Sequence, residues 1–243
     1  MSDSLQKKDD RVLEKGFELM DGATGDLGGL SNDVADNQIV SANVDYSLEE
    51  RLEAYEDIID SEVGDTMLVR ARNMERETGV RQLYLKFEGG NPTGSQKDRI
   101  AFAQAMDALR RGFDAITVAT CGNYGAALSL AASLAGIRCI IFILEQYHTK
   151  RIAEMINFKA DIRKLPGNYE DVVEISREYA EKHEVYDANP GGANTALQLK
   201  AYGEIAYEIY DELRDAPKAI AVPVSNGTTL AGIYTVSHKF LPF

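Results

Sequence analysis

The stretch KFEGGNPTGSQKDR, residues 86–99, places a single lysine, Lys97, between a turn-forming NPTGS segment and the start of a predicted helix. The N-terminal end of a helix carries partial positive charge, so it is an unfavourable position for a cation. Two interpretations are open. Lys97 is either a surface lysine paired with Asp98 or a nearby glutamate, which local chemistry alone favours, or a lysine that takes part in a reaction.

The composition limits the possible function classes. The chain of 243 residues has 39 acidic and 26 basic residues, a net charge of −13, and so lacks the basic face that a nucleic-acid partner requires. We expect no membrane span, because no apolar run is long enough, and no secretory signal, because the start is charged. With only Cys121 and Cys139, we expect reduced thiols and a cytoplasmic location. The three histidines are isolated, which predicts no metal site.

From about residue 80 the chain alternates between predicted strands and helices. The strands are apolar on both faces, which is typical of parallel sheets covered by helices on either side, so we predict an α/β fold. Predicted strands span 82–88, 115–121, 138–144, 161–165, 184–188 and 218–224. Predicted helices span 47–60, 98–112, 123–136, 149–160, 169–183, 193–213 and the residues from about 229.

The chain is long enough for one large domain or two small ones, and the family resemblance carried by its loop motifs implies two three-layer α/β/α domains with mostly parallel sheets. Residues 1–44 are rich in Gly, Asp and Asn, and we expect a flexible N-terminal arm there. A small domain is expected at 85–185. Residues 45–84 together with 186–243 are expected to form part of a larger domain.

Ligands of such folds bind at loops beyond the carboxyl ends of the strands, which here are the loops at 89–97, 121–125 and 225–229. The last of these, SNGTT, has small residues and hydroxyls before a predicted helix, which suits one phosphate group, although a plain helix cap explains it equally well. The loop CGNYG, residues 121–125, permits tight backbone geometry and offers the Asn123 amide to a ligand; a turn with a capping asparagine is the alternative.

Lys97 would have a clear role beside a phosphate site. An amine there can form a Schiff base with a phosphorylated aldehyde, and desolvation together with the positive helix end would lower its pKa and promote that reaction.

Together, the three loops resemble a known family. NPTGSQKDR, ATCGNYGAA and VPVSNGTTLAG, in this order, are similar to motifs of the fold-type II pyridoxal-phosphate enzymes, whose fold is that of the tryptophan synthase β chain. The resemblance covers residues from about 60 to 243, and the NPTGS-x-KDR form is most similar to threonine synthase. It implies pyridoxal 5′-phosphate as cofactor, a small amino-acid substrate and a homodimer.

The resemblance also implies roles for individual residues. Lys97 matches the lysine that holds the cofactor covalently and later moves protons on the substrate, and Asn123 matches the asparagine that hydrogen-bonds the cofactor ring. Thr120, Cys121 and Gly122 lie where the family binds the substrate carboxylate. The loop matching the phosphate-binding segment consists of Ser225, Asn226, Gly227, Thr228 and Thr229.

Several residues depart from the family pattern around the substrate. Gln96 stands where a phenylalanine is common, Cys121 and Tyr124 replace Ser and Thr, Thr228 replaces a glycine, and Met67 replaces a proline. These changes leave cofactor binding unaffected but make the substrate uncertain. Tyr124 would narrow the substrate pocket or add a proton-transfer group; the alternative is a tyrosine that packs on the next helix.

Family members also continue beyond the point where this sequence ends. The resemblance therefore implies a C-terminally truncated chain, an incomplete second domain and exposed apolar edges. The favoured function is that of a threonine synthase, which converts O-phosphohomoserine to threonine and phosphate in amino-acid biosynthesis. The alternatives are a β-replacement enzyme (cysteine or cysteate synthase-like), a threonine or serine dehydratase, and an inactive cofactor-binding remnant.

Overall fold

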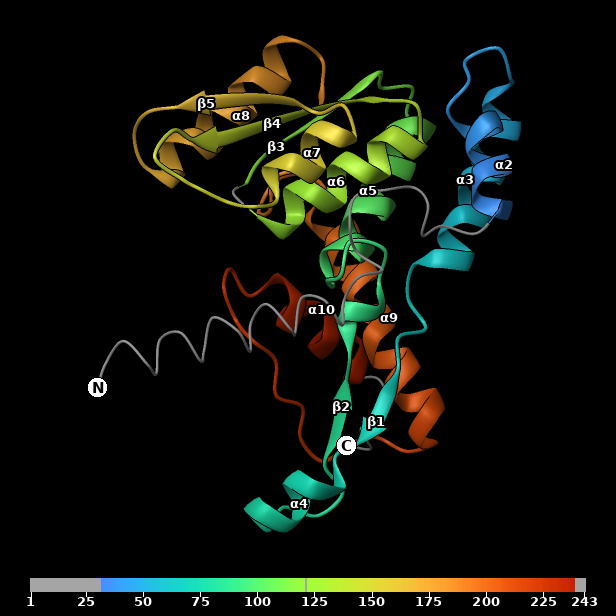
Figure 1. The fold of residues 1–243 in the computed structure, drawn as a ribbon, viewed down its shortest axis with the longest axis vertical. Helices are drawn as coiled ribbons and strands as arrows, with labels where there is room; N and C mark the ends of the chain where they lie inside the picture. Colours follow the sequence, from blue (N-terminus) through green and yellow to red (C-terminus); the bar gives the residue numbers. More distant parts are fainter. Residues whose placement is uncertain (1–31, 121, 239–243) are drawn as a thin grey trace.

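The computed structural model describes residues 32–120 and 122–238. Figure 1 shows a sheet with its covering helices at the top, and a long helix and a two-stranded hairpin that extend away from it. The four strands of the sheet are parallel and adjacent in the order β5, β4, β3, β6. Their bounds are Ala115–Ala119 for β3, Arg138–Leu144 for β4, Asp161–Leu165 for β5 and Tyr186–Asp187 for β6.

Helices cover both faces of this sheet, because each parallel connection must cross over. α5, α6 and α7 lie on one face and α8 lies on the other, which gives three layers (Figure 1). Their bounds are Lys97–Arg110 for α5, Asn123–Leu134 for α6, Ile152–Asn157 for α7 and Tyr169–Lys182 for α8. The α/β prediction is confirmed by this arrangement.

Alternation along β3 divides its side chains between two apolar cores. Ile116 and Val118 belong to the larger core, which α5 and α6 also enter. Ala115 and Ala119 belong to a smaller core with Val172 of α8. Every residue of β3 is buried, as the continuous apolar run AITVA predicts for a central parallel strand.

The second part of the molecule contains little sheet. β1 (Leu68–Arg70) and β2 (Tyr84–Lys86) form an antiparallel pair, with α4 (Arg72–Thr78) in the connection and the short 3₁₀ helix η2 (Glu88–Gly90) after it. α9 (Thr195–Leu213) and α10 (Thr228–Ser237) pack against each other beside this pair. In the described residues, this part therefore has no parallel sheet.

The predicted strand at 218–224 is wrong for this structure, because these residues adopt no regular secondary structure. A strand requires a neighbour that satisfies its backbone hydrogen bonds, and no described strand lies along this segment. Apolar side chains are exposed here and on the nearby elements. They include Met67, Val69, Leu85, Phe87, Val224, Leu230 and Tyr234.

The expected flexible arm differs from the structure at its C-terminal end. Residues 32–41 form helix α2 (Asn32–Ser41), in which Val34 is buried and the Ser41 hydroxyl donates to the Leu134 carbonyl at 2.6 Å. A single buried valine and one hydrogen bond to α6 hold this segment despite its polar composition. Residues 1–31 of the predicted arm lie outside the described residues.

The helix predicted at 47–60 is confirmed as α3 (Leu48–Glu62). Its capping box is present: the Ser47 hydroxyl accepts from the Glu50 amide, and the Glu50 carboxylate accepts from the Ser47 amide. On the buried side of α3, the Tyr55 hydroxyl donates to the Ala131 carbonyl at 3.0 Å, which joins α3 to α6.

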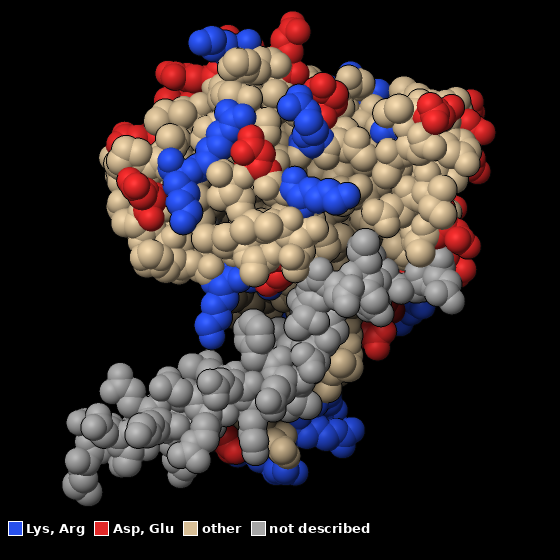
Figure 2. Space-filling model, turned by 45° about the horizontal axis from the view of Figure 1, so that its top comes forward, with Lys and Arg blue, Asp and Glu red and all other residues tan. Residues whose placement is uncertain are grey.

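The surface of the sheet region carries charges of both signs. On the face shown in Figure 2, lysine and arginine groups are interspersed with aspartate and glutamate groups. This face therefore presents no extended field of one sign. Within the described residues, no helix has the length and apolar character needed to cross a membrane.

The turn after α6 gives a test of the packing of the N-terminal helices. Gly136 has a φ of +66°, and a Cβ there would lie 2.6 Å from the Ala42 Cα, whereas Gly112 has a φ of +76° and open space. Gly112→Ala is expected to lower the free energy of unfolding by about 1–2 kcal/mol through backbone strain alone. Gly136→Ala is expected to cost about 1–3 kcal/mol more, because the Ala42 backbone must also move. Urea unfolding of both variants measures the difference; equal losses would contradict the close approach.

Candidate active site

The NPTGS turn before Lys97 is held by a buried carboxylate. Asp98 is fully buried and accepts hydrogen bonds from the Thr93 amide at 3.0 Å and the Thr93 hydroxyl at 2.8 Å. Burial raises the pKa of the Asp98 carboxyl to about 6, although the Thr93 hydrogen bonds oppose the shift. Asp98 therefore fixes the turn and is not the ion-pair partner of Lys97.

Lys97 is the first residue of α5, and its side chain is partly buried. Its amine lies 3.1 Å from the phenol oxygen of Tyr202 on α9. Burial lowers the pKa of the Lys97 amine. The interpretation of Lys97 as an ordinary surface lysine paired with a carboxylate does not agree with this environment.

A cavity of about 200 Å³ brings Lys97 together with the loop predicted to bind phosphate. The two segments are far apart in the sequence and meet only in the folded chain. The residues that line the cavity are Gln96, Lys97, Pro223, Val224, Ser225, Asn226, Gly227, Thr229 and Leu230.

The loop at 225–229 forms the turn that leads into α10. Gly227 precedes α10 with a φ of +84°, in the left-handed region that favours glycine. The Asn226 side-chain oxygen accepts from the Thr228 amide at 3.2 Å and from the Thr228 hydroxyl at 3.0 Å, which shapes the turn. Thr228 itself does not line the cavity. The cavity therefore faces the N-terminal end of a ten-residue helix, where partial positive charge favours an anion.

Two glycines let α10 approach α9 closely and so place this loop. A Cβ on Gly232 would lie 2.6 Å from the Tyr202 Cβ and 2.7 Å from the Leu199 carbonyl oxygen. A Cβ on Gly203 would lie 2.6 Å from Cγ2 of Val236. Neither contact leaves room for a side chain unless the neighbouring atoms move.

The loop between β3 and α6 holds the residues predicted to bind the substrate and the cofactor ring. The Thr120 amide donates to the Phe142 carbonyl at 3.0 Å, and Gly122 caps α6, whose first residue, Asn123, is exposed. A Cβ on Gly125 would lie 2.5 Å from Cε of Met155 and 2.9 Å from Cγ2 of Thr120, so this glycine lets the start of α6 lie close to both residues. Of these residues, Thr120, Gly122 and Asn123 lie outside the lining of the 200 Å³ cavity, and Cys121 lies outside the described residues.

Tyr124 points into the core rather than into the cavity. Its hydroxyl donates to the Ala188 carbonyl at 2.8 Å and accepts from the Gln104 amide, and the side chain is buried. Burial raises the pKa of the Tyr124 phenol well above its usual range. The predicted substrate contact of Tyr124 therefore does not agree with the structure, which shows the alternative of a packed tyrosine.

The sequence analysis missed two features beside Lys97. One is Tyr202, which carries no local signal because it lies within a helix of ordinary amphipathic pattern. The other is Arg99, two residues after Lys97, which pairs with Glu88 at 2.7 Å and with Glu208 at 2.6 Å. Glu208 also pairs with Lys86 on β2. The sequence signal for Arg99 was the KDR motif itself, in which residues of opposite charge alternate at the start of a predicted helix.

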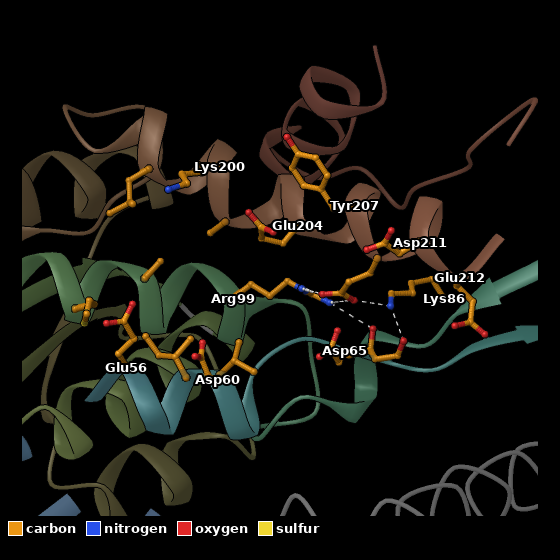
Figure 3. Close-up of a pocket in the computed structure, with 18 of the residues that line it drawn as sticks. Glu56, Asp60, Asp65, Lys86, Arg99, Lys200, Glu204, Tyr207, Asp211 and Glu212 are labelled. Carbon is orange, nitrogen blue, oxygen red and sulfur yellow. Dashed lines mark hydrogen bonds and ion pairs between the residues drawn. The ribbon is translucent and has the colours of Figure 1, made fainter. Parts of the chain in front are cut away.

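Arg99 also lies at the centre of a larger cleft of about 890 Å³ between α3, α5 and α9. Figure 3 shows Arg99 and Lys86 meeting carboxylates in this cleft, with Glu56 and Asp60 on one wall and Glu204 on the other. Lys97 is not among the residues that line it. The cleft is therefore distinct from the lysine cavity, although Arg99 and Lys97 begin the same helix.

Comparison with known proteins shows the family of the chain. The family model described as pyridoxal-phosphate dependent enzyme matches residues 59–242. The chain belongs to this family. The match includes all three loops, and the resemblance stated from their motifs is confirmed.

Curated relatives of this family member include threonine synthases. The chain is 31% identical over 179 residues to the threonine synthase of Methanocaldococcus jannaschii. The aligned residues make up 73% of this chain and 44% of that relative. It is 33% identical over 184 residues to that of Mycobacterium tuberculosis, which covers 72% of this chain and 49% of the relative. The chain therefore spans about half the length of the curated relatives that it matches.

Solved structures share the fold. An aspartate racemase that depends on pyridoxal 5′-phosphate matches with a TM-score of 0.68 at 25% identity, covering 77% of this chain and 58% of the racemase. A cysteine synthase from Entamoeba histolytica matches with a TM-score of 0.65 at 21% identity, covering 75% and 56%. The predicted fold class, that of the tryptophan synthase β-like enzymes, is confirmed.

The glycine contacts between α9 and α10 give a paired test. Gly203→Ala is expected to be the milder change, because its closest contact is a side-chain methyl group of Val236 and because alanine favours the helix by about 1 kcal/mol over glycine, which offsets part of the clash. Gly232→Ala is expected to lower the free energy of unfolding by about 1–3 kcal/mol, because the Leu199 carbonyl belongs to the backbone of α9 and cannot yield without displacing that helix. Denaturant unfolding measures both; a larger loss for Gly203→Ala would contradict the observed packing.

The buried Asp98 gives a pH test. Its folded-state pKa of about 6 exceeds the ordinary value of 3.8, so the folded chain holds this proton more tightly than the unfolded chain. The contribution of Asp98 to stability is therefore greatest at low pH and declines as pH rises from about 3.8 to about 6. Asp98→Asn is expected to flatten that part of the profile of unfolding free energy against pH. An unchanged slope in the variant would contradict the raised pKa.

Proposed function

We propose that this chain binds pyridoxal 5′-phosphate between Lys97 and the loop at 225–229 and forms part of an enzyme that acts on an amino acid. The observation that carries the proposal is the 200 Å³ cavity, where a desolvated amine faces a helix N-terminal end lined with hydroxyls. An amine suits an aldehyde and a helix N-terminal end suits a phosphate, so the residues present fit the two functional groups of this cofactor.

In this proposal the residues of the chain bind and orient, while the cofactor, when bound, supplies an electron sink. The Lys97 amine would hold the cofactor and would also be the group that moves protons at the substrate's α and β carbons. Ser225, Asn226, Gly227, Thr228 and Thr229 form the phosphate loop. Thr228 acts there through its hydrogen bonds to Asn226.

The β3–α6 loop is proposed to complete the site on the substrate side. Thr120, Cys121 and Gly122 bind the substrate carboxylate, and Asn123 hydrogen-bonds the cofactor ring. The exposure of Asn123 supports this role, since its amide is accessible to a ligand. We do not propose a substrate contact for Tyr124, which is buried.

The finer assignment is threonine synthase, with O-phosphohomoserine as substrate. It is supported by the NPTGS-x-KDR motif and by relatives of that name at 31–33% identity. A β-replacement enzyme, a dehydratase and an inactive cofactor-binding remnant are the alternatives. Phosphate release from O-phosphohomoserine would favour the first, turnover of serine or threonine the dehydratase, and bound cofactor without turnover the remnant.

The domain division proposed from the sequence accompanies this function. Residues 85–185 would carry the Lys97 and Asn123 loops, while 45–84 and 186–243 would carry the phosphate loop. We further propose a cytoplasmic location, from the two cysteines, and a homodimer, from the family resemblance.

The cofactor assignment is tested by the visible absorption spectrum of the purified chain with added pyridoxal 5′-phosphate. The parent is expected to show the band of a lysine-bound cofactor, and Lys97→Ala is expected to lose it entirely, because the reacting amine is gone. Lys200→Ala is the matched control: Lys200 is an exposed lysine of α9 that lines the other cleft, and its variant should keep the band. Absence of the band in the parent would refute the proposal.

A further inference from the structure

Tyr202 is the nearest polar partner of the Lys97 amine in the described structure. Its phenol oxygen lies 3.1 Å from Nζ of Lys97, and Nζ lies 5.6 Å from the centre of the Tyr202 ring. The tyrosine is fully buried, whereas Lys97 is partly exposed toward the cavity. The lysine therefore reaches the cavity past a fixed phenol.

The backbone around Tyr202 sets the position of that phenol. Tyr202 stands on α9 where Gly232 of α10 comes closest, so close that a Cβ on Gly232 would collide with the tyrosine Cβ. Thr229, in the phosphate loop, lies close enough to act on the phenol, whose pKa burial raises and Thr229 lowers. One side chain thus contacts the lysine and the helix that follows the loop.

We propose that Tyr202 is a positioning residue that holds the Lys97 amine at the phosphate loop until the amine reacts. This inference rests on the proposed function of Lys97. The inference means that α9, which contains none of the three loop motifs, helps to position the Lys97 amine.

The chemistry of a phenol explains why this partner suits a reactive amine. Burial raises the pKa of the Tyr202 phenol, so the group stays neutral and accepts a hydrogen bond from the ammonium without forming an ion pair. A carboxylate at the same place would stabilise the charged amine and keep it protonated. A neutral partner orients the amine but does not cancel the effect of burial, which lowers the pKa of Lys97.

The charged groups around this pair are engaged elsewhere. The charges that act on Tyr202 are those of Glu88, Asp98 and Arg99. Arg99 and Glu88 pair with each other at 2.7 Å, and the Asp98 carboxylate accepts from Thr93. None of these groups replaces the phenol as a partner of Lys97 in the described structure.

The experiment compares the parent, Tyr202→Phe and Tyr207→Phe in two measurements. Tyr207 is the matched control, because it lies on the same helix but lines the other cleft (Figure 3). The first measurement is the rate at which a small acetylating reagent modifies Lys97 as a function of pH, read by mass spectrometry without cofactor. The second is the rate at which pyridoxal 5′-phosphate and borohydride together label Lys97. Thermal unfolding checks that each variant is folded; phenylalanine keeps the ring that packs on α10.

In Tyr202→Phe, the pH midpoint of Lys97 acetylation is expected to fall, because the ammonium loses its hydrogen-bond acceptor. Labelling by pyridoxal 5′-phosphate at high pH is expected to slow by roughly ten- to a hundredfold, because the amine is no longer held at the loop. Tyr207→Phe is expected to change neither. A tyrosine that only fills the core would leave the midpoint unchanged.

The two measurements separate this inference from the proposed function. An unchanged midpoint and an unchanged labelling rate in Tyr202→Phe would overturn the role of Tyr202, provided that the parent is labelled at Lys97. The third outcome is a lowered acetylation midpoint in Tyr202→Phe together with a parent that pyridoxal 5′-phosphate does not label. It would support the contact between Tyr202 and Lys97 and refute the proposed cofactor role of Lys97.

Discussion

The buried ion pairs of Arg99 are the constraint on which the rest of the site depends. Its side chain is only 3% exposed and pairs with Glu88 and with Glu208. Burial alone would lower the pKa of this guanidinium, but the two carboxylates outweigh burial and raise it. Removing one carboxylate would leave a buried charge uncompensated, at a typical cost of about 3–5 kcal/mol. Because Arg99 follows Lys97 by two residues, the same ion pairs fix the start of α5 against α9.

The opposite wall of the site depends on close packing rather than charge. α10 reaches α9 because Gly203 and Gly232 lack side chains where the two helices meet. This approach places the 225–229 loop beside Tyr202, and Tyr202 in turn contacts Lys97. α9 therefore positions both the lysine and the loop. Ion pairs and a hydrogen bond connect α9 to the start of α5, and close backbone packing connects α9 to α10.

Sequence predicted those parts of the structure that local patterns determine. The β4 strand was predicted at its observed bounds because a continuous apolar run suits a buried parallel strand, and α3 because its capping box is local. The predicted strand at 218–224 failed because a strand depends on a neighbour, which an apolar pattern does not supply. Within the site, motifs identified Lys97 and the 225–229 loop, but the inward orientation of Tyr124 and the contact of Tyr202 arise from packing between distant segments.

The separation of these contacts along the chain affects how the molecule folds. The strands of the parallel sheet lie within residues 115–187, so their pairing closes moderate loops. Lys97 and Tyr202 are 105 residues apart, and Arg99 and Glu208 are 109 apart. Closing such long loops costs entropy before any contact compensates for it, and folding rates fall as contact order rises. The lysine turn is thus synthesised early, and during translation it must wait for α9 and α10 to leave the ribosome before a site exists.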